Sequence, residues 1–214
     1  MTYRLAIFDL DGTLADTWPW FVDALDEAAI RFGLHRPDAA EREALRHCGS
    51  REILRRLRVP LWKLPAIARH MRARKAEAGK RVALFPGAEA MLERLASGGI
   101  TLAMVSSDSE ANVRATLGRS ASLVAHFACE ASLFGKPAHL RRVLKLSGIA
   151  AREAIYIGDE VRDAEAARKA GLAFGAVTWG FAAHEALAAQ LPAALFTSFD
   201  QVPDFLSPGH FLPA

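Results

Sequence analysis

Leu5-Ala6-Ile7-Phe8-Asp9-Leu10-Asp11-Gly12-Thr13 is the stretch that decides the fold, because an apolar run ends in two carboxylates. The run Arg4–Phe8 is nearly all apolar, as expected of a parallel strand covered on both faces. Ligands of open α/β sheets bind just beyond the carboxyl ends of such strands. Asp9 and Asp11 have like charges, so they need a cation, a shared proton or water to coexist. Mg²⁺ fits, since one or two carboxylates, waters and a substrate phosphate usually hold it. Alternatively, one carboxylate attacks a substrate while the other moves a proton.

Bulk composition excludes several classes of protein. The chain has 214 residues, of which 51% are hydrophobic, enough for one large domain or for a core with an insert. It shows neither a secretory signal at its start nor an apolar run long enough to span a membrane. Cys48 and Cys129 form no CxxC pattern, which argues against a disulfide scaffold or a zinc site. We therefore expect a cytoplasmic protein with reduced thiols and without a membrane partner.

The net charge of +3 is unevenly distributed. Residues 16–80 contain 14 Lys and Arg against 9 Asp and Glu, a surplus of +5, and the remaining residues carry −2. This surplus would attract an anionic substrate. No known nucleic-acid-binding signature accompanies it, so a nucleic-acid partner is disfavoured.

The periodicity of apolar residues divides the chain into two parts. From Thr17 to about Lys80 it is helical, with Pro19 in a first turn, Thr17 and Asp16 as capping residues, and Gly33 as a stop. Further helices are predicted over residues 39–47, 51–57 and 65–78, with no strand. After Gly87, predicted helices over 88–96, 110–117, 137–146 and 161–170 alternate with strands over 100–105, 126–129, 154–157 and 173–178. This alternation predicts an α/β fold with a Rossmann-like parallel sheet.

Polar residues of complementary chemistry follow other predicted strands. Ser106-Ser107-Asp108 ends one of them, and a hydroxyl there can hold a phosphoryl oxygen. Lys136 precedes a helix, where its charge can neutralise a phosphate or a carboxylate. Asp159-Glu160 ends a third strand, and Asp163 follows one helical turn later. Together these groups suggest a phosphoryl-transfer site built around Mg²⁺.

The order DxDGT, strand-Ser, GKP and GDxxxD resembles the haloacid dehalogenase superfamily of aspartyl-phosphate hydrolases. The helical insert resembles the cap of its phosphoglycolate phosphatase and β-phosphoglucomutase branch. The likeness extends from Arg4 to about Trp179. It implies a core of residues 1–15 plus 81–214 and a helical cap domain of residues 16–80.

The resemblance also implies roles for single residues. Asp9 matches the nucleophile, and Asp11 matches the general acid/base that offers its backbone carbonyl to Mg²⁺. Ser106 matches the phosphate-binding hydroxyl, and Lys136 the lysine that stabilises negative charge. Asp159 matches the acidic Mg²⁺ ligand, so the implied metal site is Asp9, Asp11 and Asp159. The expected supporting residues are Asp163 and Glu160.

Contacts with the substrate are expected from Gly12, Thr13, Ser107 and Arg51. Many relatives have Asn where Ser107 stands, which leaves the roles of Ser107 and Asp108 open. Arg51 follows Gly49-Ser50 at a predicted helix start, where backbone N–H groups and a guanidinium can bind an anion. An ordinary capped helix with an exposed arginine is the alternative. Trp18 and Trp20 are expected to pack near the hinge between cap and core.

The second carboxylate distinguishes between reactions. Dehalogenases that resemble this fold lack the second carboxylate, because a halide leaves without a proton. An alkoxide leaving group needs a proton, and general acid catalysis is typically worth about 10²–10⁴ in rate. We therefore expect a Mg²⁺-dependent phosphatase acting on a small phosphorylated metabolite such as phosphoglycolate, as a monomer or homodimer. A phosphomutase is the alternative, and a phosphate- or nucleic-acid-binding module without turnover is the non-enzymatic one. Phosphonate hydrolysis would need a Schiff-base lysine in the cap, where Lys63, Lys75 and Lys80 are available.

Overall fold

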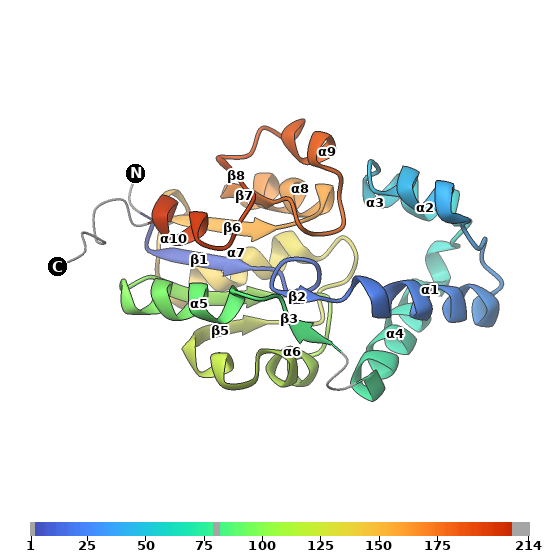
Figure 1. Ribbon diagram of the computed structural model, residues 1–214, viewed down its shortest axis with the longest axis horizontal. Coiled ribbons are helices and arrows are strands. Elements are labelled where there is room, and N and C mark those ends of the chain that lie inside the picture. Colours follow the sequence, from blue (N-terminus) through green and yellow to red (C-terminus); the bar gives the residue numbers. More distant parts are fainter. Residues whose placement is uncertain (1–2, 79–81, 207–214) are drawn as a thin grey trace.

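The computed structural model describes residues 3–78 and 82–206 and has a six-stranded parallel sheet at its centre (Figure 1). The strand order is β5-β4-β1-β6-β7-β8, so the strand that carries the DxDGT motif lies between the strands that precede Ser106 and Asp159. The strands are β1 (Leu5–Phe8), β4 (Thr101–Val105), β5 (Val124–Ala128), β6 (Ala154–Gly158), β7 (Ala173–Val177) and β8 (Ala194–Phe196).

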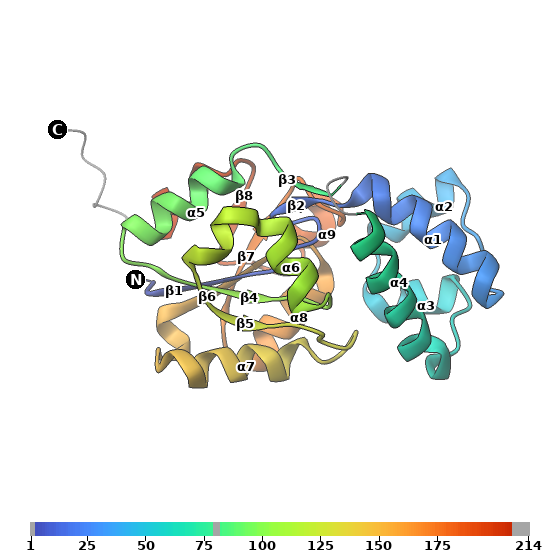
Figure 2. The same cartoon turned by 90° about the horizontal axis from the view of Figure 1, so that it is seen from below.

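Helices cover both faces of this sheet, so the apolar side chains of β1 are buried in two directions. Ala6 and Phe8 belong to one core cluster and Leu5 and Ile7 to the other, as the alternation of side chains along a strand requires. Figure 2 shows α5 on one side of the strands and α7 on the other. The first cluster includes residues of α5 (Ala88–Ser97), α6 (Glu110–Leu117) and α10 (Gln201–Leu206), and the second those of α7 (Lys136–Ser147), α8 (Val161–Ala170) and α9 (His184–Ala188).

The insert between β2 (Ala15–Asp16) and β3 (Ala83–Leu84) consists of helices in the residues that the structure describes. These helices lie beyond the carboxyl ends of the strands (Figure 1). Arg46 Nε donates to the carbonyl of Phe181 at 2.8 Å, so the insert contacts the loop after β7. Its elements are α1 (Trp18–Phe32), α2 (Ala39–Leu45), α3 (Ser50–Arg56), the 3₁₀ turn η1 (Leu61–Lys63) and α4 (Leu64–Ala78).

Most predicted elements are present, and the differences are local. Helices α6 and α8 have the predicted bounds, and α1 ends at Gly33, which has a left-handed φ of 61°. Thr17 is the N-cap of α1, as predicted, although its side chain makes no capping bond, and Asp16 lies in β2. The two-residue pair β2–β3 was not predicted, because two residues carry no periodicity. The predicted boundary at residues 80 and 81, including Lys80, lies outside the described residues.

None of the helices in residues 3–78 and 82–206 combines the length and the apolar character needed to cross a membrane.

The burial of α7 predicts unequal effects of two leucine truncations on the same helix. Leu140 is fully buried, whereas Leu146 is 55% exposed. Leu140→Ala should lower the free energy of unfolding by about 2–5 kcal/mol, since it removes buried methyl groups and leaves a cavity. Leu146→Ala should change it by no more than about 0.5 kcal/mol. Urea denaturation of both variants measures the difference, and equal losses would contradict the described packing of α7.

Candidate active site

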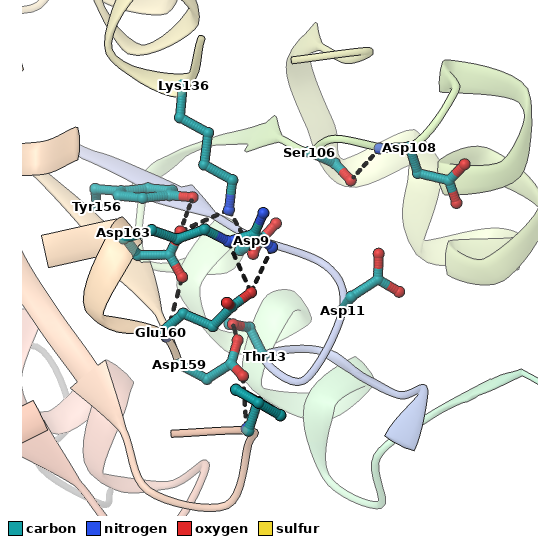
Figure 3. Close-up of polar contacts among 12 residues, drawn as sticks. Asp9, Asp11, Thr13, Ser106, Asp108, Lys136, Tyr156, Asp159, Glu160 and Asp163 are labelled. Atoms are coloured by element: carbon teal, nitrogen blue, oxygen red, sulfur yellow. Dashed lines mark hydrogen bonds and ion pairs between the residues drawn. The ribbon is translucent and has the colours of Figure 1, made fainter. Parts of the chain in front are cut away.

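Four elements of the core bring charged side chains together at the carboxyl edge of the sheet (Figure 3). Asp9 follows β1, Asp159 follows β6, Lys136 begins α7, and Asp163 lies in the first turn of α8. All four side chains are buried, with at most 2% of each residue exposed. Burial of so many charges is costly unless they are paired, so the contacts between them determine the site.

Lys136 is the centre of this group. Its Nζ donates to Asp9 Oδ2 at 2.7 Å and to Asp163 Oδ1 at 2.5 Å. Asp163 is further fixed by the Tyr156 hydroxyl, which donates to Oδ1, and by the backbone N–H of Glu160, which donates to Oδ2, both at 3.1 Å. The lysine is therefore held against Asp9 by a carboxylate that is itself fully hydrogen-bonded.

Asp159 is oriented by different partners. Thr13 Oγ1 donates to its Oδ1 at 2.8 Å, and the backbone N–H of Phe181 donates to its Oδ2 at 2.7 Å. Gly12 has a φ of 74°, and a Cβ there would lie 2.2 Å from Asp159 Oδ2. A Cβ at Gly180 would lie 2.3 Å from Asp159 Cβ. Only glycine therefore allows the two loops to approach this carboxylate so closely.

The backbone N–H groups of Gly12 and Thr13 already donate hydrogen bonds within their own turn. The N–H of Gly12 donates to Ala15 O at 2.9 Å, and that of Thr13 donates to Leu10 O at 3.2 Å. With the Thr13 hydroxyl on Asp159, the visible contribution of both residues is to shape the turn and to orient that carboxylate.

Arg162 and Glu160 form a further pair beside the site. Arg162 Nε donates to Glu160 Oε1 at 2.8 Å, and each side chain is only 18% exposed. Glu160 was expected near a metal ion, but nothing in the sequence motif pointed to Arg162. The pair matters because the positive charge of Arg162, like that of Lys136, lowers the pKa of Asp9.

The carboxylates of Asp9, Asp159 and Asp163 offer oxygens that all lie within 4.8 Å of one another. The resemblance implies Asp9, Asp159 and the backbone carbonyl of Asp11; this group of side chains contains the first two and adds Asp163. Both oxygens of Asp163 already accept hydrogen bonds. Both oxygens of Asp159 also accept hydrogen bonds, but from the neutral donors of Thr13 and Phe181. Asp9 and Asp159 match the cation-binding carboxylates that the resemblance implies, and Asp163 acts on Lys136.

The charges of the site fit a divalent cation. Four carboxylates, including Glu160, face the two cations Lys136 and Arg162, which leaves a net charge of −2 when all are ionised. Burial raises the pKa of Asp9 to about 6, although Lys136 lowers it. Burial and the neighbouring Glu160 raise the pKa of Asp159 well above its usual value. Oxygen ligands with excess negative charge are those that Mg²⁺ prefers.

A second polar group lies beyond β4. Ser106 is fully buried, and its Oγ accepts a bond from the Asp108 N–H at 3.1 Å, which leaves the hydroxyl hydrogen to donate. The Ser107 carbonyl accepts from Arg72 Nε of α4 at 2.9 Å. Asp108 is buried, and the sequence alone did not indicate its role. The contacts of Ser107 and Asp108 therefore join this loop to the insert.

Asp11 does not contact the acidic group around Asp9. Its Oδ1 accepts from Lys75 Nζ of α4 at 2.5 Å, and Lys75 also pairs with Asp108 Oδ2 at 2.8 Å. Burial lowers the pKa of Lys75, but the two carboxylates more than offset it and raise the pKa overall. Lys75 is thus an ammonium ion, which is not a nucleophile, so this lysine is unsuited to Schiff-base chemistry.

Arg51 lies in a different place from the acidic group. It is exposed and lines a groove of about 660 Å³ between α3 and the loop before α7, together with Arg55, Arg58, Leu61 and Phe134. The predicted helix start is confirmed, since Gly49 is the N-cap of α3, and the binding of an anion by Arg51 stays a prediction.

Trp18 and Trp20 pack where the insert meets the core, as expected of hinge residues. The Trp18 ring lies 5.2 Å from that of Phe181, and Trp20 packs against the first core cluster.

Comparison with known proteins gives consistent matches. Residues 6–177 match the protein family described as haloacid dehalogenase-like hydrolase. The phosphoglycolate phosphatase of Synechococcus elongatus is 34% identical over 188 residues, which cover 87% of this chain and 89% of that protein. That of Yersinia pseudotuberculosis is 30% identical over 216 residues, covering 92% and 90%.

Solved structures share the fold. A protein from Lactobacillus plantarum has a TM-score of 0.81 at 21% identity, covering 94% of this chain and 98% of its own. CbbY from Rhodobacter sphaeroides in complex with phosphate has a TM-score of 0.71 at 25% identity, covering 94% and 96%.

The raised pKa of Asp9 predicts how a cation and pH together affect stability. Without a cation, the folded state favours protonated Asp9. The contribution of Asp9 to the free energy of unfolding is therefore fully present below pH 3.8 and is lost as pH rises through about 6. If Mg²⁺ binds at these carboxylates, a concentration of about 100 times its dissociation constant should add roughly 2.7 kcal/mol to the free energy of unfolding. This corresponds to a Tm increase of roughly 5–10 °C. This increase should be large at pH 7.5 and small at pH 5, where protons compete.

Thermal unfolding at both pH values with Mg²⁺ or chelator measures this effect. Asp159→Asn should remove most of the Mg²⁺-dependent increase, whereas the exposed control Asp200→Asn should keep it. An increase that is equal at pH 5 and pH 7.5 would contradict binding at these carboxylates.

Proposed function

Because the chain belongs to the haloacid dehalogenase-like hydrolase family, we propose that it hydrolyses a small phosphomonoester through an aspartyl phosphate on Asp9. It is a hydrolase of the phosphatase type, as its relatives are. The observation that supports the mechanism is the buried contact of Asp9 with Lys136 at 2.7 Å, beside two further buried carboxylates. A nucleophilic carboxylate needs this combination of fixed orientation and nearby positive charge.

Two displacements at phosphorus make up the proposed reaction. An oxygen of Asp9 forms a bond to phosphorus while the bond to the leaving oxygen breaks, and Asp11 donates a proton to that oxygen. Asp11, now a carboxylate, takes a proton from water, whose oxygen attacks the aspartyl phosphate. Inorganic phosphate leaves and Asp9 is regenerated, so the sum is a phosphomonoester plus water giving an alcohol plus phosphate.

Asp9, Asp159 and the backbone carbonyl of Asp11 are the groups that we propose hold Mg²⁺. When bound, the ion would offset the repulsion between the phosphate and these carboxylates. Asp163 keeps Lys136 against Asp9, and the Ser106 hydroxyl is the proposed donor to a phosphoryl oxygen. Gly12 and Thr13 contribute through Asp159, which Thr13 orients.

The substrate we propose is a phosphorylated small acid of the phosphoglycolate kind. Relatives that cover most of the chain are named phosphoglycolate phosphatases. In addition, residues 16–80 hold the basic surplus of the chain, which favours a substrate with a second negative charge. We propose that these residues act as a cap domain that excludes water from the site, with residues 1–15 and 81–214 as the core.

Phosphate release from a panel of phosphorylated metabolites and p-nitrophenyl phosphate tests this proposal. Release should require Mg²⁺, stop with chelator, and favour phosphoglycolate. Asp9→Asn should lower kcat by at least about 10³-fold, because the amide cannot form the intermediate. The exposed control Asp200→Asn should retain full activity.

Two outcomes would count against the proposal. Activity that survives Asp9→Asn would exclude the aspartyl phosphate. Interconversion of phosphate isomers without release would indicate the phosphomutase alternative.

A further inference from the structure

The two hydrogen-bond donors that orient the Asp159 carboxylate both depend on the loop after β7 (residues 178–183). Phe181 of this loop donates its backbone N–H to Asp159 Oδ2 at 2.7 Å. The second donor is the Thr13 hydroxyl, which bonds Oδ1 at 2.8 Å (Figure 3). Thr13 is tied to the same loop, because Trp179 Nε1 donates to its backbone carbonyl at 2.9 Å. Trp179 and Phe181 therefore hold one carboxylate from two directions.

The loop also packs directly against Asp159. A Cβ at Gly180 would lie 2.4 Å from Asp159 Oδ2, so the main chain touches the carboxylate with no side chain between them. The next residue but one, Ala182, donates its N–H to the backbone carbonyl of Asp159 at 3.2 Å. The Trp179 ring lies 4.4 Å from that of Phe199, which supports the loop from the core. A shift of the loop must therefore displace the carboxylate.

The insert holds the other side of this loop. Arg46, the C-cap residue of α2, donates from Nε to the Phe181 carbonyl at 2.8 Å, and its own carbonyl accepts from the Ala183 N–H at 3.0 Å. The Phe181 ring lies 5.2 Å from the ring of Trp18 and 6.5 Å from that of Phe21, both in α1. A continuous series of contacts thus runs from the insert to the carboxylate.

We propose that Trp179 and Arg46 are positioning residues for Mg²⁺ binding, because they hold the loop that orients Asp159. This inference rests on the proposed function, in which Asp159 is a ligand of the cation. Trp179 acts through the Thr13 carbonyl. Arg46 acts through the Phe181 carbonyl. Partners that orient metal ligands by hydrogen bonds matter for binding, and their loss typically costs about 10–100-fold in metal affinity.

Two readouts distinguish positioning from simple support of the fold. A variant that only weakens the fold has a lower Tm in chelator, but its folded state binds Mg²⁺ as tightly as wild type. A variant that misplaces Asp159 needs more Mg²⁺ for the same increase of Tm above its own value in chelator, since that increase depends on the ratio of Mg²⁺ to its dissociation constant. Its kcat should recover at saturating Mg²⁺, because the reacting groups are unchanged.

Thermal unfolding across a MgCl₂ series, on purified protein without substrate, measures the dissociation constant. Trp179→Phe keeps a ring beside Phe199 but removes the N–H, and it should raise the constant about 10-fold. Arg46→Met removes the donor to Phe181 and should also raise it about 10-fold. Both variants should keep kcat within about threefold of wild type at saturating Mg²⁺. If one variant does not fold, the other decides the test.

Trp62→Phe and Arg42→Met are the matched controls. Trp62 is 78% exposed in η1, so its change removes an indole N–H far from any core packing. Arg42 lies on α2, near Arg46 in the chain, and its Nε also donates to a backbone carbonyl, that of Pro37, at 3.1 Å. It also pairs with Asp26, so these contacts stay within the insert. Both controls should bind Mg²⁺ within about twofold of wild type.

Each outcome is decisive. Wild-type dissociation constants in Trp179→Phe and Arg46→Met would overturn the positioning role while leaving the proposed phosphatase function in place. An equal increase in Arg42→Met would overturn it as well, since any weakening of the insert would then suffice. A wild-type protein that neither responds to Mg²⁺ nor releases phosphate would overturn the proposed function and this inference with it.

Discussion

The buried contact of Lys136 with Asp9 and Asp163 is the constraint on which the rest of the site depends. An ammonium ion in the interior costs several kcal/mol unless it is paired, and these two carboxylates, at 2.7 and 2.5 Å, provide the pairing. Lys136 begins α7, Asp9 ends β1, and Asp163 lies in the first turn of α8. One contact therefore fixes the relative position of two helices and the central strand. Because removal of one partner would leave a buried charge, the three residues act as a unit.

Close approach of the backbone gives this unit its shape. A Cβ at Gly12 or Gly180 would lie within 2.3 Å of an atom of Asp159, and one at Gly158 would lie 2.6 Å from Asp163 Oδ2. Main chain at these glycines therefore forms part of the wall around the acidic group. The carboxylate oxygens lie close together in this enclosed site. Burial there raises the pKa of Asp9 and of Asp159. The same enclosure that makes the charges costly makes the site suitable for a cation.

Local sequence was sufficient for the fold and for part of the candidate site. The alternation of apolar runs predicted the parallel sheet, and the polar residues after those runs predicted that Asp9, Lys136 and Asp159 would meet, since parallel strands end at one edge. Lys75 and Arg162 could not be predicted in the same way. Residues 64–78 contain several basic side chains, and only the approach of α4 to the core buries one of them against carboxylates. Contacts between distant segments leave no periodic signal in either segment.

The two lysine clusters differ in a way that matches the proposed chemistry. Lys136 and its partners Asp9 and Asp163 all belong to the core, so these contacts hold Asp9 without the insert. Lys75 of α4 pairs with Asp11 and Asp108 of the core, so the second cluster joins the insert to the core.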